Sequence, residues 1–326
     1  MFLWRRLEPF AQRIFELLVR IGARLNARSK RVERIAMLVA VLIFVGGSVL
    51  AYVNLPESAS EPIWTLLIVV AIVGVPLTVA TNAAEYVMSA NMLGYRAPFG
   101  SALKVSLLAT AANMLPLPGS VLVRTEAVRR LGATMSKALA TSTVVGIAWL
   151  ATTATLTGVL LLAHGRMAVG TISTGVGALL LGATFLLCLR LDPARVLITS
   201  SRLLVVESAS VLVKAARLYV IFRALHYAVG IDQVLVLTSA AVVSTATGFF
   251  PAGMGATEVL SAAVSPLVDL PPALSLLAAA VDRIIGLAGL AVLSGLVLLR
   301  APRLAADVKE MRDASEVVRG QSKSMP

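Results

Sequence analysis

The feature that most constrains this chain is a series of apolar segments that recur between residues 35 and 299 with only short connections. A helix that crosses the hydrocarbon core of a bilayer needs about 20 consecutive apolar residues. Apolar residues make up 58% of the chain and charged residues only 14%, whereas soluble domains contain about 25% charged residues. Backbone polar groups in lipid must pair within their own segment, which favours helices. The sequence therefore predicts an all-α polytopic membrane protein.

The basic residues predict how the chain is oriented. The net charge is +12, and Lys and Arg number nine in residues 1–34 and six in residues 300–326. Basic residues beside membrane spans are typical of the cytoplasmic side, so we expect both termini in the cytoplasm. Residues 1–34 fit a basic amphipathic helix on the membrane surface, or else a soluble lead-in helix. Residues 301–326 fit a charged cytoplasmic tail. Nothing resembles a nucleic-acid-binding motif.

Eight apolar segments follow one another, and two of them are interrupted. About six have the length of full spans: 35–52, 63–93, 138–163, 167–189, 203–227 and 272–299. The other two, 98–123 and 233–268, are broken by NMLPLPG at 113–119 and GFFPAGMG at 248–255. Their halves are too short to cross a bilayer, which predicts two re-entrant helical hairpins. The alternative is an eight-span bundle with two proline-kinked helices.

The flanking charges predict that the two hairpins enter from opposite faces. Arg96 and Arg124 flank the first break, whereas Asp232 and Asp269 flank the second segment with no Lys or Arg between them. The order span, span, hairpin, span occurs twice, in about 35–163 and 167–300. Three full spans per half is an odd number, so the second half is expected to be inverted. Inverted repeats with broken helices are typical of transporters.

Several ionisable residues lie inside apolar segments, where they are costly and usually face a cavity or a partner. Glu258 follows the second break, and Asp282 and Arg283 lie well inside the last span. We predict an ion pair between Glu258 and Arg283. A polar stripe is predicted along one helix face, formed by Glu207, Ser210, Lys214 and Arg217. The alternative is an ion-pair network that only holds the helices together.

Other polar and aromatic residues are interpreted more simply. Glu85 lies near the cytoplasmic end of its span and is expected at the interface, and Trp149 is expected in an interfacial aromatic belt. The sequence has one cysteine and two distant histidines and lacks nucleotide-binding and zinc-protease patterns. It therefore indicates no catalytic residues, no metal and no cofactor.

The two breaks place helix starts inside the membrane. Gly119 and Gly255 each precede a short second half-helix. Free N–H groups and the positive end of the helix dipole favour an anion at such a start. Glycine also lets a ligand approach the backbone closely. A phosphate-bearing ligand is therefore the expected kind of substrate.

Three segments together resemble a known family. NMLPLPGSVLVRTEAVRRLG (113–132), FFPAGMGATEVL (249–260) and VDRIIGLAGL (281–290) are similar to hallmark motifs of the lysylphosphatidylglycerol synthase transmembrane-domain family, which are lipid-flippase-like membrane proteins. The matching positions are Asn113, Pro116, Gly119, Arg124, Pro251, Gly253, Gly255, Glu258 and Arg283. The resemblance covers about residues 35–300.

The chain departs from that family's pattern in two places. Ser120 stands where the family usually has Glu, with Glu126 as a candidate substitute, and Arg124 lies one residue further from Gly119 than usual. Fused family members carry a soluble aminoacyl-transfer domain after the membrane part. Only 26 residues follow Arg300, so synthase activity is not expected of this chain.

The residues and the resemblance together imply a non-enzymatic transporter that moves a lipid with a phosphate-containing headgroup between leaflets. Expected partners are an anionic phospholipid or a polyprenyl-phosphate lipid, a lipid-modifying transferase, and a second copy of the chain. The alternatives are a non-transporting membrane partner of a separate glycosyl- or aminoacyl-transferase, and a secondary transporter of a soluble organic anion. The candidate substrate-binding residues are Asn113, Pro116, Gly119, Arg124, Glu126, Lys214, Arg217, Pro251, Gly253, Gly255, Glu258, Asp282 and Arg283.

Overall fold

The structure, a computed structural model, describes residues 41–42, 44–49, 53, 62–113, 119–247 and 253–322. Across these residues the chain is helical, contains no β-strand, and has five helices long and apolar enough to cross a membrane. These are Trp64–Asn91, Met135–Ala163, Met167–Leu191, Pro193–Ala224 and Pro272–Val297. The prediction of an all-α protein with membrane-spanning helices is confirmed. The lead-in helix predicted for residues 1–34 and most of the first predicted span lie outside the described residues.

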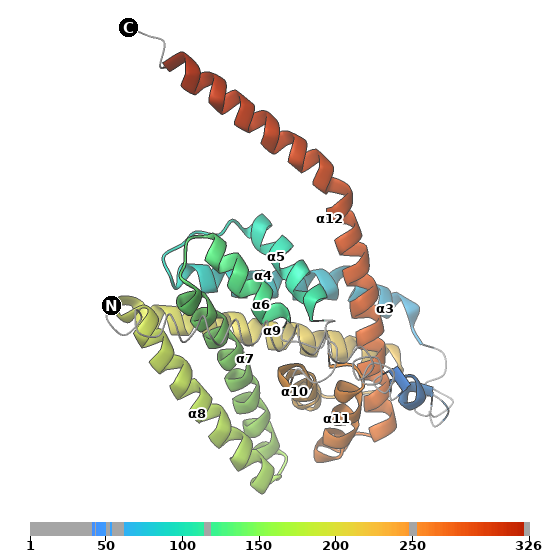
Figure 1. Cartoon of the computed structure of the whole chain (residues 1–326). Helices are drawn as coiled ribbons and strands as arrows, with labels where there is room; N and C mark the ends of the chain where they lie inside the picture. Colours follow the sequence, from blue (N-terminus) through green and yellow to red (C-terminus); the bar gives the residue numbers. More distant parts are fainter. Residues whose placement is uncertain are drawn as a thin grey trace, which may run out of the picture.

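Each half of the chain contains two consecutive short helices followed by a long helix, and the second half has two long helices before its short pair (Figure 1). The first half contains α3 (Trp64–Val69), the π-helical turn η2 (Val70–Gly74), α4 (Val75–Asn91), α5 (Phe99–Ala112), α6 (Gly119–Arg130) and α7 (Met135–Ala163). The second half contains α8 (Met167–Leu191), η3 (Pro193–Arg195), α9 (Val196–Ala224), α10 (Ile231–Thr247), α11 (Ala256–Val264), η5 (Ser265–Val268) and α12 (Pro272–Ser322).

The chain turns back on itself at each predicted break. Ala102, near the start of α5, and Val128, near the end of α6, belong to one buried cluster, so these helices pack side by side. Val234 of α10 shares a cluster with Val268, and the side-chain amide of Gln233 donates to the Val268 carbonyl at 2.8 Å. Both segments are therefore helical hairpins, and the alternative of two kinked helices is wrong. In Figure 1 the α5–α6 hairpin lies above α9 and the α10–α11 hairpin below it.

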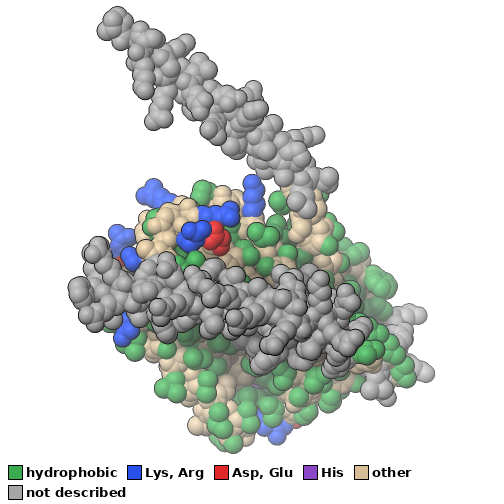
Figure 2. Space-filling view, in the orientation of Figure 1, with side chains coloured by type: hydrophobic (Ala, Val, Ile, Leu, Met, Phe, Trp, Pro, Cys, Tyr) green, Lys and Arg blue, Asp and Glu red, His purple; other side chains and the backbone are tan. Residues whose placement is uncertain are grey.

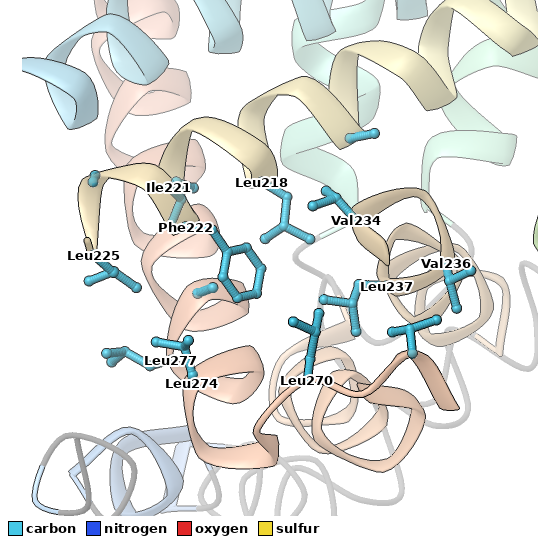
Figure 3. Close-up of a cluster of buried hydrophobic side chains, with 14 of the residues drawn as sticks. Leu218, Ile221, Phe222, Leu225, Val234, Val236, Leu237, Leu270, Leu274 and Leu277 are labelled. Carbon is cyan, nitrogen blue, oxygen red and sulfur yellow. The ribbon is translucent and has the colours of Figure 1, made fainter. Parts of the chain in front are cut away.

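The largest buried apolar cluster joins α9 to the second hairpin and to the start of α12. Figure 3 shows Leu218 and Phe222 of α9 facing Leu237 of α10, with Leu274 and Leu277 of α12 below them. Leu and Phe on one face of α9 recur at helical spacing, so this face packs closely while the opposite apolar residues stay outside. This cluster fixes the second hairpin against the long helices that carry the buried charges.

Small residues bring α7 and α8 into close contact. A Cβ on Gly158 would lie 2.4 Å from the Thr174 nitrogen, and one on Gly177 would lie 2.3 Å from Thr155 Oγ1. Backbones approach this closely in membrane proteins through small residues at the contact. The outer face of α8 is apolar and exposed, as expected beside lipid, with Met167, Val169, Ile172, Val176, Leu179 and Leu186 uncovered.

The last helix is longer than predicted. The sequence placed the end of the final span near residue 299 and a separate tail after it. Instead α12 runs without a break from Pro272 to Ser322, with its apolar, span-like part ending at Val297. The residues after the span favour helix by their Ala, Leu, Glu and Arg content. The tail is therefore a continuation of the span, projecting away from the other helices (Figure 1).

The described surface is apolar between charged ends. On the face that Figure 2 shows, Lys and Arg side chains gather near the top and again at the bottom edge, with hydrophobic side chains between them. Many large apolar side chains are exposed, among them Trp64, Leu179 and Leu197 at 69%, 77% and 72%, whereas soluble monomers rarely expose large contiguous apolar patches. This distribution agrees with a protein that sits in a bilayer.

Candidate functional site

Helix α9 carries the predicted polar stripe into the protein interior. Glu207, Ser210 and Arg217 are buried and Lys214 is half-buried. Their spacing of three or four residues places them on one helix face, and α9 packs against α4, α7 and α12. The stripe therefore faces other helices rather than lipid.

Arg217 is held by three neighbouring groups. Its Nη2 lies 2.7 Å from Asp282 Oδ1 in an ion pair and donates to the Asp282 carbonyl at 3.2 Å. Its Nη1 donates to Thr78 Oγ1 at 3.0 Å. The guanidinium thus links α9 to α4 and α12, a contact that the sequence did not predict.

Two glycines make room for the Arg217 side chain. A Cβ on Gly74 would lie 2.7 Å from Arg217 Cγ, and one on Gly286 would lie 3.2 Å from its Nη2. Gly74 ends the π-helical turn, and Pro76 begins the next helix. Because proline has no N–H to donate, the hydrogen-bond ladder is interrupted here, and such π turns are frequent at functional sites. Gly74, Thr78 and Gly286 were missed by sequence reasoning.

Neighbouring residues of α12 point to different helices. Asp282 pairs with Arg217 of α9, whereas Arg283 Nε lies 2.5 Å from Glu258 Oε1 of α11. The predicted pair between Glu258 and Arg283 is confirmed. Glu258 is 1% exposed, so this carboxylate depends on its partner for charge compensation.

Arg283 also closes the second break. Its Nη2 donates to the Gly253 carbonyl at 3.1 Å and to Thr257 Oγ1 at 2.6 Å. Gly253 and Gly255 have φ values of 69° and 79°, a region that residues with a Cβ rarely adopt. The glycines therefore let the chain turn into α11, and Arg283 ties that turn to α12.

The first break is built differently. Asn113 ends α5, and its side-chain Oδ1 accepts the backbone N–H of Ser120 at 3.0 Å. It thereby satisfies one of the free N–H groups at the start of α6, as a helix cap does. A Cβ on Gly119 would lie 2.1 Å from the Ala112 carbonyl oxygen. Only glycine allows the two half-helices to meet so closely.

Arg124 of α6 pairs with Glu85 of α4, with Nη1 2.7 Å from Oε2. The interpretation of Glu85 as an interfacial residue was wrong, because its side chain is buried and carries this ion pair. An acidic residue inside a 28-residue apolar helix could have been recognised as a buried partner. The first hairpin is thus fixed to the long helices by charge.

Lys214 lies over an aromatic ring. Its Nζ is 4.0 Å from the centroid of the Trp149 ring, within the range of a cation–π interaction. The prediction that Trp149 belongs to an interfacial belt was wrong. Trp149 stands in the middle of α7, and that position in the span could have excluded the interface.

Glu126 does not join these buried residues. Its carboxylate accepts from Arg129 at 2.7 Å and from Arg130 at 3.0 Å on an exposed face. Hydrogen bonds from Arg129 and then Arg130 lower the pKa of Glu126 to about 2. The prediction that it replaces the family glutamate near the break was wrong, because α6 turns its side chain away from the helix core.

A second charged contact closes the opposite end of the molecule. Arg166, in the α7–α8 turn, pairs with Asp269 at 3.0 Å, and His164 Nε2 lies 3.0 Å from Asp232. Arg166 Nε also donates to the Leu267 carbonyl at 3.1 Å. The turn between α7 and α8 therefore contacts both ends of the second hairpin. None of these contacts involves the buried charges around α9.

Several buried polar atoms have no hydrogen-bond partner among the described residues. They include the Nε of Arg124 and of Arg217, the indole nitrogen of Trp149 and both carboxylate oxygens of Glu207. Buried donors and acceptors are normally paired, and unpaired ones often mark a bound ligand or water. Two of these donors, on Arg124 and Arg217, belong to positively charged guanidinium groups, so the group that they suit is an anion.

The structure places most of the predicted site residues in three groups. Arg124, Lys214, Arg217 and Asp282 belong to the charges around α9, and Gly253, Gly255, Glu258 and Arg283 form the second break; Asn113 and Gly119 form the first. Pro116 and Pro251 lie outside the described residues. No group of acidic, His or Cys side chains suited to a metal ion occurs in the described part of the chain.

Comparison with known proteins does not identify a family. No protein-family model matches this sequence, and no curated protein matches it. The resemblance to the lysylphosphatidylglycerol synthase transmembrane-domain family therefore stays a prediction that rests on the three motifs.

Proposed function

We propose that this chain is a membrane transporter that moves a lipid with a phosphate-containing headgroup between the two leaflets. The observation that carries the proposal is the pair of buried guanidinium Nε–H groups, on Arg124 and Arg217, that have no acceptor among the described residues. Guanidinium groups bind phosphate oxygens through strong, charge-assisted hydrogen bonds. Such donors inside apolar helices suit an anion that would otherwise be very unfavourable in the membrane.

The acids beside these cations explain how the headgroup could leave again. Each guanidinium already contacts a carboxylate: Glu85 beside Arg124, and Asp282 beside Arg217. A phosphate would share the cation with that carboxylate rather than meet an isolated charge. Transport requires binding that is strong enough for entry and weak enough for release, and partly compensated cations provide this balance.

The two helix starts supply further donors. At the first break one N–H of α6 is taken by Asn113, whereas the start of α11 at Gly255 carries no side-chain cap. Lipid tails would stay in the bilayer while the headgroup passes these polar groups. Two inverted halves could then open the site to each leaflet in turn.

The orientation is part of the proposal. We place both termini in the cytoplasm of a bacterial inner membrane and the two hairpins on opposite faces, on the strength of the positive-inside rule. Single cysteines introduced at Arg96 and Met167 in a Cys188→Ser background test this. An impermeant thiol reagent applied outside should label position 167 and spare position 96. External labelling at position 96 would contradict the inverted arrangement.

Reconstitution tests the function itself. Purified protein in phosphatidylcholine vesicles would be given fluorescent phosphatidylglycerol, fluorescent polyprenyl phosphate or fluorescent phosphatidylcholine in one leaflet. We expect the protein to speed movement of an anionic lipid more than that of the zwitterionic one. A protein that moves none of the three would contradict the proposal and favour a non-transporting partner of a transferase. Movement of a soluble organic anion alone would favour a secondary carrier.

A further inference from the structure

Glu207 is a buried acid that takes part in none of the ion pairs described above. It lies on α9 with a fully buried side chain, and neither carboxylate oxygen has a hydrogen-bond partner in the described structure. An ionised carboxylate without hydrogen bonds is very unfavourable in an apolar interior, whereas a protonated carboxyl group is far less so. The charges around Glu207 therefore determine whether its carboxylate binds a proton or a metal cation.

The charged groups that act on Glu207 come from three helices. They are Glu85 of α4, Arg124 of α6 and Lys214 of α9 itself. Arg124 is already paired with Glu85, and Lys214 lies against the Trp149 ring. Arg217 and Asp282, which pair with each other, act in turn on Lys214. A metal cation would meet two positive side chains here, so a proton is the ligand that fits.

The charge count shows what that proton does. With Glu207 protonated, two cations, Arg124 and Lys214, face one carboxylate, Glu85, and the group carries one excess positive charge. With Glu207 ionised, two cations face two carboxylates and the group is neutral. An anion is attracted to the first state and not to the second.

We propose that Glu207 is a proton-binding site, and that its protonation opens the Arg124–Lys214 group to an anionic lipid headgroup. The step is a simple proton uptake from water by the Glu207 carboxylate, with no other reactant. The second half of the statement rests on the proposed function, whereas the proton site does not. Proton and headgroup then bind together, and release of the proton favours release of the headgroup.

Infrared difference spectroscopy on the purified protein tests the proton site. The C=O stretch of a protonated carboxyl absorbs apart from ionised carboxylates. We expect a protonated-carboxyl band that is lost on raising the pH, is absent in Glu207→Gln, and is shifted but present in Glu207→Asp. The exposed Glu126→Gln is the matched control and should keep the band. A band that persists in Glu207→Gln, or its absence from the wild type at every pH, would overturn the proposal.

Fluorescence of Trp149 tests the coupling. Trp4→Phe and Trp64→Phe leave Trp149 as the only tryptophan of the chain's three, and it lies against Lys214. In nanodiscs of phosphatidylcholine with or without phosphatidylglycerol, we expect the phosphatidylglycerol response to weaken by up to about tenfold in affinity per pH unit as Glu207 loses its proton. Phosphatidylglycerol keeps a single charge over this range. Glu207→Gln should hold the low-pH affinity over the pH range in which Lys214 stays protonated.

The outcomes separate the two claims. The same pH dependence in wild type and Glu207→Gln would overturn the coupling. The infrared band without any phosphatidylglycerol response would overturn the coupling and the proposed headgroup, and would support the proton site alone.

Discussion

The two hairpins are fixed to the long helices by ion pairs of opposite sense. In the first, the hairpin supplies the cation, Arg124, and the long helix supplies the acid, Glu85. In the second, the hairpin supplies the acid, Glu258, and the long helix supplies the cation, Arg283. Similar positions after a break thus reach the same kind of contact through opposite charges.

The two pairs also differ in which buried atom is left without a hydrogen-bond partner. Arg283 makes further hydrogen bonds to Gly253 and Thr257, but Oε2 of the almost fully buried Glu258 has no donor in the described structure. In the first pair the unpartnered atom is a donor, because the buried Nε–H of Arg124 has no acceptor among the described residues. We infer that the second pair mainly holds its hairpin in place, whereas the first has donor capacity left for a ligand.

The largest loss in the free energy of unfolding is expected for substitutions in the second pair, Glu258 and Arg283. Glu258→Gln or Arg283→Gln leaves one buried charge without compensation, which costs about 3–5 kcal/mol. The double variant should cost less than the sum, because no unpaired charge remains. Thermal unfolding in detergent, run as a double-mutant cycle, measures this. Strictly additive losses would show that the two residues are not coupled.

A smaller loss is expected at the first pair. Glu85→Gln or Arg124→Gln removes a charge-assisted contact worth about 1.5–3 kcal/mol. Arg124 is more exposed than Arg283, with 15% against 10% of the side chain uncovered, so part of the lost contact can be replaced by water. Thermal unfolding in detergent, again run as a double-mutant cycle, measures this loss. A loss larger than that of the second pair would reverse the comparison.

Next comes the cap of the first hairpin. Asn113→Ala removes the acceptor for the Ser120 N–H and should cost about 1 kcal/mol. Asn113→Asp keeps an acceptor at that place and serves as the control. Hydrogen exchange of the first turn of α6 should speed up in the alanine variant only. Equal exchange in both variants would show that the cap does not hold α6.

The smallest change in the free energy of unfolding is expected for substitution of Glu126. Its pKa is lowered to about 2, so it stabilises the folded state above its unfolded pKa of about 4.3, and that contribution is lost as the pH falls toward 2. The pairs with Arg129 and Arg130 are exposed, and such pairs contribute little. Glu126→Gln should melt close to wild type at pH 7 and show no difference near pH 2. A large change in melting temperature at pH 7 would contradict this and would indicate that Glu126 belongs to the candidate site.

Apolar segment length and the two proline- and glycine-rich breaks predicted the helices and hairpins closely. The length of the last helix was not predicted, because α12 continues to Ser322 past Pro302, a residue type that normally interrupts a helix. The Glu258–Arg283 pair was predictable because both charges stand in otherwise apolar surroundings. The Glu85–Arg124 pair was missed because the place of Glu85 near the end of its apolar segment favours the interface, whereas its place inside an apolar helix, which favours a buried partner, was given too little weight. Gly74 and Gly286 were missed because close approach to Arg217 depends on how three helices pack.

The central claim is that the buried cation of the first pair, Arg124, binds a headgroup and does not only hold helices together. The most direct measurement compares lipid movement in proteoliposomes for Glu85→Gln/Arg124→Gln, which leaves no unpaired charge, with that for Arg166→Gln/Asp269→Asn, which removes the pair at the opposite end. At matched melting temperature, we predict that the first double variant loses movement of fluorescent phosphatidylglycerol and the second retains it. Wild-type movement in the first double variant would contradict the account.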